Sequence, residues 1–326
     1  MLAGKSYHPS RQSRLYGKHL ALSASEQRVV ETIVLGHARL DGPELRQLAP
    51  ERRAAVIDTL LDYQQFAFDR SKQQAGARSS PEYFQALAAR LALPAGEPSG
   101  VAGEVESPEH GRAPSWFQVG YVQHGRTGSA RTLRFRPAYY DALDASRAQA
   151  WNGSLAMGDV ILEERAQRWR IRQADLLAID STNPAVTGLP GDRGFAWKLK
   201  FGAEPERYTC THCRVTRLQG DVGLGRRLGA SDIFAALYAG GAMQTNGRFD
   251  GAGFARLSAA VTFRPAPDFG IKLTHEQRKP FEASRRISSA TRAELRLGIR
   301  QKYDLRFIWE RDDEASRLTV GLGFYL

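Results

Sequence analysis

Apolar and polar residues alternate through most of the second half of the chain. In the segment 255–264 the odd positions are apolar, whereas the even positions include Arg256, Ser258 and Arg264. Successive side chains of a strand point to opposite faces of a sheet, so this pattern predicts strands with one apolar and one polar face. Similar segments bring the total to about twelve strands: 117–121, 131–137, 160–164, 168–179, 195–201, 217–224, 233–242, 269–276, 293–300, 303–310 and 318–326.

The predicted strands are joined by short connections with turn residues. Thr245-Asn246-Gly247, Asp250-Gly251 and the Pro265–Asp268 segment are examples. Strands joined in this way pair antiparallel, and no helical segment separates them, which excludes a parallel α/β sheet. We therefore predict a mainly β protein with an N-terminal helical subdomain, in which an antiparallel up-and-down meander closes into a barrel.

In residues 23–92 the apolar positions recur every three or four residues, which is the spacing of a helix. Ser23 and Glu26 form a capping-box pattern, Pro50 suits the first turn of a second helix, and Ser80-Pro81 opens a third. The apolar positions form amphipathic packing stripes, which predict a small helical unit without chemistry of its own. We expect a helical connector at 1–93, a linker rich in Pro, Gly and Glu at 94–115, and the barrel at 116–326.

The direction of the apolar face decides between two kinds of barrel. A soluble barrel buries that face, whereas an outer-membrane barrel presents it to lipid and keeps charges inside. The predicted strands are roughly 9 to 13 residues long, which suits a tilted bilayer crossing better than the ~5 to 6 residues of average strands. The last strand, with Thr319, Gly321, Phe324 and Leu326, also resembles the outer-membrane assembly signal. We expect the outer-membrane type, with a soluble periplasmic barrel or sandwich that acts as a binding module as the alternative.

The charges of the chain are consistent with a polar lumen. The net charge is +11, and 38 of the 46 basic residues are Arg, spread singly along the strands rather than in clusters. This distribution does not predict a nucleic-acid partner. No apolar run approaches the ~20 residues of a spanning helix. The candidate lumen residues are Arg134, Arg217, Arg256, Arg296, Arg306, Asp304 and Glu294.

Two interpretations of these lumen arginines remain open. They could attract anions in a binding or conducting barrel. Alternatively, they could form ion pairs that fill the interior. The carboxylates available for pairing are Asp221, Glu276, Glu294, Asp304 and Glu310.

Cys210 and Cys213 are the only cysteines. Their spacing allows a redox disulfide, half of a zinc site or a loop staple, and a four-ligand zinc site lacks its second pair. We expect a disulfide in an oxidising compartment. The seven histidines form no pair at metal-ligand spacing, so no metal is predicted.

No pattern in the sequence predicts catalysis or a cofactor. We find no nucleophile elbow, P-loop or dinucleotide fingerprint. An enzyme would need a Ser, His or carboxylate cluster that faces the lumen, and His275, the only histidine of the later strands, falls on the apolar face beside Leu273. We therefore predict no catalytic residue.

Several short segments of the chain form a recognisable set. They contain His110, Gly111, Arg136, Pro137, Tyr139, Asp141, Leu143, Asp144, Asp175 and Ser181. Together these segments resemble the C-terminal region of a proteobacterial family whose N-terminal part is the periplasmic Lnb domain, a relative of lipoprotein N-acyltransferases. The Cys210/Cys213 pair and helices 23–92 are also similar to that region.

The resemblance implies a non-catalytic cell-envelope protein, located in the outer membrane or periplasm of a Gram-negative cell. It would anchor or scaffold an acyltransferase-like partner domain. The catalytic Cys and His of the family lie upstream of the matching region, and neither Cys210 nor Cys213 fits their motif. The residues after Met1 form no signal peptide, so we expect a truncated or split product of a longer exported protein.

Overall fold

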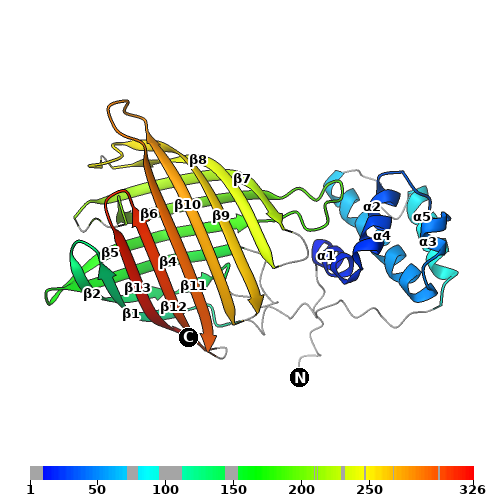
Figure 1. Cartoon of the computed structure of the whole chain (residues 1–326), viewed down its shortest axis with the longest axis horizontal. Coiled ribbons are helices and arrows are strands. Elements are labelled where there is room, and N and C mark those ends of the chain that lie inside the picture. Colours follow the sequence, from blue (N-terminus) through cyan, green and yellow to red (C-terminus); the bar gives the residue numbers. More distant parts are fainter. Residues whose placement is uncertain are drawn as a thin grey trace, which may run out of the picture. The chain divides into compact units, whose positions relative to one another are not determined.

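The computed structural model describes residues 10–71, 80–94, 112–143, 153–208, 210, 212–228, 232–245, 247–266, 268–299 and 302–326. The chain divides into two compact units. One contains Met1–Glu109 and Val186–Arg193, and the other contains His110–Ala185 and Gly194–Leu326. Figure 1 shows the helices of the first unit in blue and cyan and the strands of the second in green to red.

The helical unit begins its main helices where the sequence predicts. Ser23 and Glu26 form the capping box of α2, with Ser23 N donating to Glu26 Oε2 at 2.7 Å. Ser80 Oγ caps α5 by accepting from Tyr83 N at 3.1 Å. The pattern missed two helices, α1 and α3. The five described helices are α1 (Arg11–Ala21), α2 (Ala24–Val34), α3 (Pro43–Arg46), α4 (Pro50–Ser71) and α5 (Pro81–Leu91).

Apolar side chains form the core of the helical unit. Val30, Ile57 and Leu60 are buried in one cluster, and Leu189 joins them from the Val186–Arg193 segment that follows β5 in the sequence. The same segment is held by Asp192, which accepts a hydrogen bond from Tyr16 Oη at 2.5 Å. The connector predicted at 1–93 therefore includes a piece of chain from the β region.

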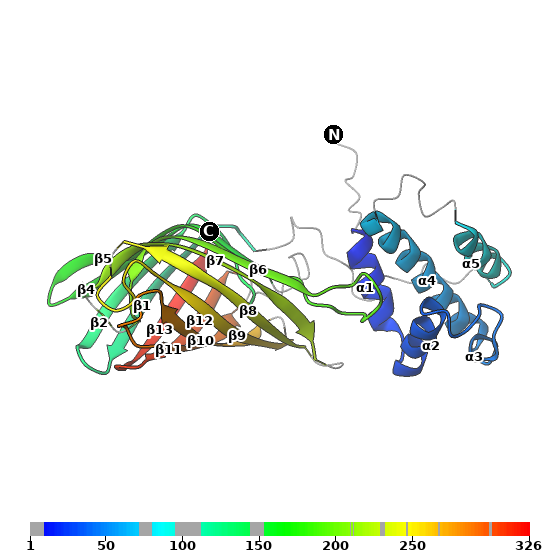
Figure 2. The same cartoon turned by 90° about the horizontal axis from the view of Figure 1, so that it is seen from above.

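The second unit is a closed antiparallel barrel of twelve strands (Figures 1 and 2), as the alternation predicts. Apart from β2 and β3, strands that follow one another in the sequence pair with each other, and β1 also pairs with β13. β2 pairs with β4, and β3 is a short extension of β2 beyond Pro137 that also lies on β4. The strands are β1 (Trp116–His124), β2 (Gly128–Arg136), β3 (Ala138–Tyr140), β4 (Gly153–Arg165), β5 (Arg168–Thr182), β6 (Phe195–Pro205), β7 (Arg214–Arg227), β8 (Ile233–Gln244), β9 (Gly253–Ala266), β10 (Phe269–Pro280), β11 (Ser288–Ile299), β12 (Tyr303–Asp312) and β13 (Ser316–Tyr325).

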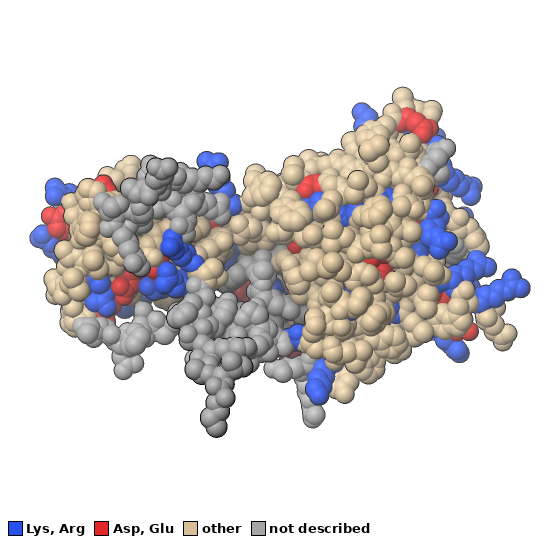
Figure 3. All heavy atoms as spheres, turned by 180° about the vertical axis from the view of Figure 1, so that it is seen from behind, with Lys and Arg blue, Asp and Glu red and all other residues tan. Residues whose placement is uncertain are grey.

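The barrel is apolar outside and polar inside. Leu237 on β8 is 64% exposed, whereas its neighbour Tyr238 is 2% exposed. Val222 faces outward on β7 while Asp221 is buried. In Figure 3 the middle of the barrel wall is largely tan, and basic residues gather toward the end of the barrel at the right of the view. The apolar face of the strands therefore points away from the lumen.

The two ends of the barrel differ in what they carry. We call the end with the start of β1 and the end of β13 the terminal end. The opposite end, with the connections β1–β2, β4–β5, β6–β7, β8–β9, β10–β11 and β12–β13, is the distal end. None of the described helices is both long and apolar enough to cross a membrane.

Candidate functional site: the charged interior of the barrel

A fully buried carboxylate organises the lumen at the terminal end. Asp304 on β12 accepts hydrogen bonds from Arg306 Nε at 2.8 Å and from Arg296 Nε at 3.1 Å. The Tyr325 hydroxyl donates to Asp304 at 2.9 Å, and Trp116 Nε1 donates at 3.2 Å. Buried charges are tolerated when they are paired and hydrogen-bonded, and Asp304 satisfies both conditions. We call these five residues the Asp304 cluster.

The segment after β3 folds into the lumen and joins this cluster. Pro137 interrupts β2, and the chain then turns inward so that Leu143 is fully buried. Arg296 Nη1 donates to the Leu143 carbonyl at 3.2 Å, and Arg306 Nη1 donates to Asp141. β11 and β12 are not neighbours of β3 in the sheet, so the segment spans part of the lumen.

Asp141 is surrounded by positive charges and hydrogen-bond donors. Burial opposes its ionisation, but the charges of Arg306 and Arg136 hold the pKa of Asp141 well below its usual value. The Tyr139 hydroxyl also donates to Asp141, and Leu143 N donates at 2.9 Å. A carboxylate with this many donors is a stable anchor for the inward turn.

A second group of contacts crosses the lumen near the terminal end. Asp180 on β5 lies 3.0 Å from Lys272 Nζ on β10, and 3.4 Å from Lys198 Nζ on β6. Tyr238 Oη on β8 donates to Asp180 at 3.1 Å. Since β5 and β10 are five positions apart in a ring of twelve, the Asp180–Lys272 pair bridges facing walls.

The middle of the lumen is filled by further ion pairs. Arg256 pairs with Glu276 at 3.0 Å and with Asp221 at 3.4 Å. Arg292 joins Glu310 at 2.6 Å and Glu294 at 3.0 Å. All five carboxylates that the sequence offered for pairing are therefore paired with arginines, and cavities of about 180 Å³ and 250 Å³ remain among the polar side chains of the lumen.

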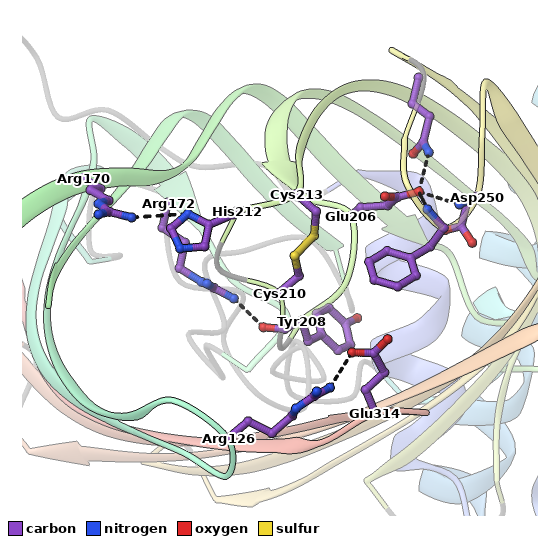
Figure 4. The surroundings of a disulfide bond; sticks show 12 residues. Arg126, Arg170, Arg172, Glu206, Tyr208, Cys210, His212, Cys213, Asp250 and Glu314 are labelled. Carbon is purple, nitrogen blue, oxygen red and sulfur yellow. Dashed lines mark hydrogen bonds and ion pairs between the residues drawn. A yellow bond between two sulfur atoms is a disulfide. The ribbon is translucent and has the colours of Figure 1, made fainter.

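The connection between β6 and β7 crosses the distal end. Cys210 and Cys213 form a disulfide in it, with their Cα atoms 5.9 Å apart. Arg207 lies 3.0 Å from Asp250, between β8 and β9, and 3.6 Å from Asp313, between β12 and β13 on the facing side of the ring. Figure 4 shows the disulfide and the groups around it. We call residues 206–213 the disulfide loop.

Buried polar groups hold the disulfide loop in place. Glu206 is fully buried, and its Oε1 accepts from the backbone amides of Phe249 (2.8 Å) and Asp250 (2.5 Å). Arg172 donates to the carbonyl of Tyr208, and burial raises the pKa of the Tyr208 hydroxyl above its usual range. The loop is therefore bound to β5 and to the β8–β9 and β12–β13 connections.

The structure places the remaining predicted residues as follows. Arg134 and Arg136 both contact Asp159, at 2.8 and 3.1 Å. Asp175 is buried near Lys200, whereas Ser181 is partly exposed on β5. The other predicted lumen residues have the partners given above, with Arg217 paired to Glu204 at 2.6 Å. His110, Gly111 and Asp144 lie outside the described residues.

The described residues bring together no metal site. No group of three His, Cys, Asp or Glu side chains among them could hold a metal ion. His275 lies on the outer face, as its position in the alternation predicts, with Nδ1 2.9 Å from Thr291 Oγ1. It is therefore not part of a lumen cluster.

Sequence reasoning missed several groups that close the lumen. Lys198 and Lys272 occupy polar positions of their strands, so alternation assigns them to the interior, but it does not pair them with Asp180. Glu206 sits in a connection without alternation. Only the closed ring brings these residues together.

Fold and interior together define a closed twelve-stranded barrel with a charged lumen. Residues 105–326 match the family model "Domain of unknown function (DUF7840)", and the chain belongs to that family. Residues 5–100 match a second model, "Domain of unknown function (DUF7842)". No curated protein matches the chain.

Solved structures of barrels are similar to this chain at low identity. The KdgM porin in complex with disordered oligogalacturonate has 9% identity and a TM-score of 0.39, covering 65% of this chain and 99% of that chain. The COG4313 outer membrane channel from Pseudomonas putida F1 has 11% identity and a TM-score of 0.39, with coverages of 69% and 98%. The Acinetobacter baumannii outer membrane protein Omp33 has 7% identity and a TM-score of 0.37, with coverages of 66% and 99%.

Proposed function

We propose that this chain is a non-catalytic protein of the Gram-negative cell envelope, with its barrel inserted in the outer membrane and its lumen closed. Its role is to anchor the helical unit and an acyltransferase-like partner domain at the membrane. The observation that carries this proposal is the set of contacts across the lumen, above all the pair between Asp180 and Lys272 on facing walls. A barrel closed by its own side chains suits an anchor better than a pore.

The outer surface supports insertion into lipid. Exposed aromatic residues occur near both ends of the strands, which is the girdle pattern of membrane barrels. The strands contain 9 to 15 residues apart from the short β3, enough to cross a bilayer at a tilt. A periplasmic barrel would leave this large apolar surface in water. The girdle residues are Tyr121, Trp169 and Trp309 toward the distal end and Phe135, Phe195 and Tyr303 toward the terminal end.

The pairing of the lumen charges supports closure. Each predicted lumen arginine has a carboxylate partner, so its charge is already compensated. An anion in the lumen would have to compete for these arginines with Asp or Glu side chains that belong to the barrel itself. These pairs favour the filled interior over the anion-conducting alternative.

The partner domain is proposed from sequence resemblance. The segment Arg136–Leu143, which resembles the barrel region of the Lnb-like family, forms the inward turn that closes the terminal end. The chain enters the barrel at this same end, directly after the helical unit. We place the terminal end in the periplasm, because the catalytic domain of the family is periplasmic.

Membrane insertion of the barrel and closure of its lumen are tested together. The full chain is expressed in a Gram-negative host with an export signal added to its N-terminus. We expect the full chain in the outer-membrane fraction, with a heat-modifiable band, and no steady conductance in planar bilayers. The double variant Asp180→Asn/Lys272→Gln should show conductance steps, whereas the rim control Arg126→Gln should not. Recovery in the periplasm without a heat-modifiable band contradicts insertion, and a steady wild-type conductance contradicts closure.

Two measurements test whether the chain anchors an acyltransferase-like partner. The first is the sequence of the reading frame upstream of Met1, and the second is copurification of a partner with the barrel. We expect a frame that encodes a Cys–His domain, whose product copurifies with the barrel from detergent-solubilised envelopes. If no such frame lies upstream and no acyltransferase-like protein copurifies, the anchoring of such a partner is ruled out.

A further inference from the structure

A cavity opens at the distal end of the closed barrel, where neighbouring strands end at different heights. The hairpin of β4 and β5 extends beyond β6, because pairing between β5 and β6 begins only at Ala174 and Ala203. β6 ends at Pro205, which has no amide hydrogen to continue the ladder. Between the protruding hairpin and the disulfide loop lies a cavity of about 460 Å³, which we call the distal cleft.

The distal cleft is strongly basic. Its lining includes four guanidinium groups, one imidazole and a single carboxylate, Glu163. Glu163 is already shared by three arginines, at 3.1 Å from Arg165, 3.7 Å from Arg172 and 4.0 Å from Arg317. Among the residues that the structure describes, no carboxylate lies within 4.0 Å of Arg170 or Arg214.

Arg170, Arg172 and Arg214 also contact groups other than carboxylates. Arg214 donates to the carbonyl of Ile171 at 2.8 Å, and Arg172 donates to the carbonyl of Tyr208. Arg170 Nη1 lies 3.4 Å from His212 Nδ1, within the loop that the disulfide closes (Figure 4). Carbonyl oxygens orient a guanidinium but leave its charge uncompensated. The lumen arginines differ, because each of them faces a carboxylate.

We propose that the distal cleft binds a phosphate group, with Arg170 and Arg214 as its principal ligands. The planar fork of a guanidinium matches the oxygens of a tetrahedral oxyanion, and such a ligand would relieve the repulsion among the clustered positive charges. The hairpin also carries Trp169 and Ile171, both about half exposed on its outward face. A phosphate borne by a lipid headgroup would place its acyl chains against these side chains.

The site is tested with two phosphate probes. The full chain, reconstituted in phosphatidylcholine nanodiscs, is titrated with inorganic phosphate and with dihexanoyl phosphatidic acid. Dihexanoyl phosphatidylcholine serves as the zwitterionic control. We expect phosphatidic acid to bind, and Arg170→Gln/Arg214→Gln to weaken its binding roughly tenfold or more, as the loss of charge-assisted hydrogen bonds implies. Binding of phosphatidic acid well above inorganic phosphate identifies lipid as the source, and equal binding identifies free phosphate.

The matched control is Arg168→Gln/Arg311→Gln. It removes the same charge from exposed distal positions outside the cleft, so it should change affinity less than twofold. Equal weakening in both double variants, or no binding of either probe to the wild type, overturns the proposal. The phosphate titration is repeated in detergent after the heat-modifiable band is verified, so failure to insert into membranes is recognised separately from failure to bind.

Discussion

The helical unit and the barrel are built from the same chain with opposite interiors. The helices bury Val30, Ile57 and Leu60 and keep most of their charged side chains at least partly exposed, whereas the barrel buries Arg296 and Asp304 and exposes leucines. In the helical unit any apolar side chain of suitable volume contributes to stability, because the hydrophobic effect is not directional. In the barrel interior each charge needs a partner at the right distance. The barrel should therefore tolerate changes outside better than inside, and the helical unit the reverse.

The largest expected effect is the loss of a lumen carboxylate. Asp304→Ala leaves Arg296 and Arg306 without their shared partner, and removing one member of a buried ionic group costs ~3–5 kcal/mol. Urea unfolding in lipid vesicles, followed by tryptophan fluorescence, measures the change. The control Glu314→Ala breaks an exposed pair with Arg126 and should cost under ~1 kcal/mol. Equal costs for the two variants would contradict the proposed importance of lumen pairing.

The helical unit should respond most to the loss of apolar volume. Leu60→Ala removes a nearly fully buried side chain from its core and should cost about 2–5 kcal/mol. Circular dichroism at 222 nm follows the helices, while the heat-modifiable band reports the barrel. We expect the helices to lose stability and the band to remain. A change confined to the barrel would show that Leu60 acts outside the helical core.

A charged substitution on the outer face of the barrel tests whether this face contacts lipid. Leu237 lies near the middle of β8 with its side chain exposed, so Leu237→Arg should cost ~2–4 kcal/mol if that face contacts lipid. Leu237→Met serves as the matched control and should be nearly neutral. Both variants are unfolded with urea in vesicles. An arginine that is tolerated as well as methionine at this position would contradict insertion.

Much of this contrast follows from the sequence. The capping box at Ser23 and the prolines that begin helices predict the main helices, and period-two alternation predicts the strands and the side of each residue. Alternation fails where the ladder is irregular, as at the shift between Asp175 and Leu177. Alternation also does not predict which residues pair across the lumen. The contact between Asp180 and Lys272 depends on ring closure, which no local pattern encodes.

The missed helix α1 has a different cause. Its buried side chains are few, Leu15, Tyr16 and His19, and most of its other residues are polar. Its start is capped by Ser10, which accepts from Ser13 N at 3.1 Å, but no glutamate follows to complete a capping box. Packing against α4 and the hydrogen bond from Tyr16 to Asp192 hold it instead. Both are tertiary contacts that a sequence pattern does not reveal.

The smallest expected effect concerns a charge at the edge of the helical unit. The hydrogen bonds from Arg52 lower the pKa of Glu26 to about 2, from an ordinary value of 4.5. A carboxyl whose folded pKa is depressed adds stability above its unfolded pKa and loses it as the pH falls toward the folded pKa. The contribution of Glu26 should therefore be complete at pH 7 and disappear between about pH 4.5 and pH 2. Since Arg52 is 46% exposed, solvent screening limits it to about 1 kcal/mol.

The difference in stability between the wild type and Glu26→Gln isolates this contribution from other titrating groups. Urea unfolding of the helices, followed at 222 nm, should give a difference of about 1 kcal/mol at pH 7 that shrinks steadily below pH 4.5. Glu31→Gln, on the exposed face of the same helix α2, is the control and should give a difference near zero at each pH. A Glu26→Gln difference that is as large at pH 2.5 as at pH 7 would mean that packing, rather than the charge of Glu26, stabilises this end of the helix. The contrast with the barrel would then be complete, because ion pairs would stabilise only the barrel interior.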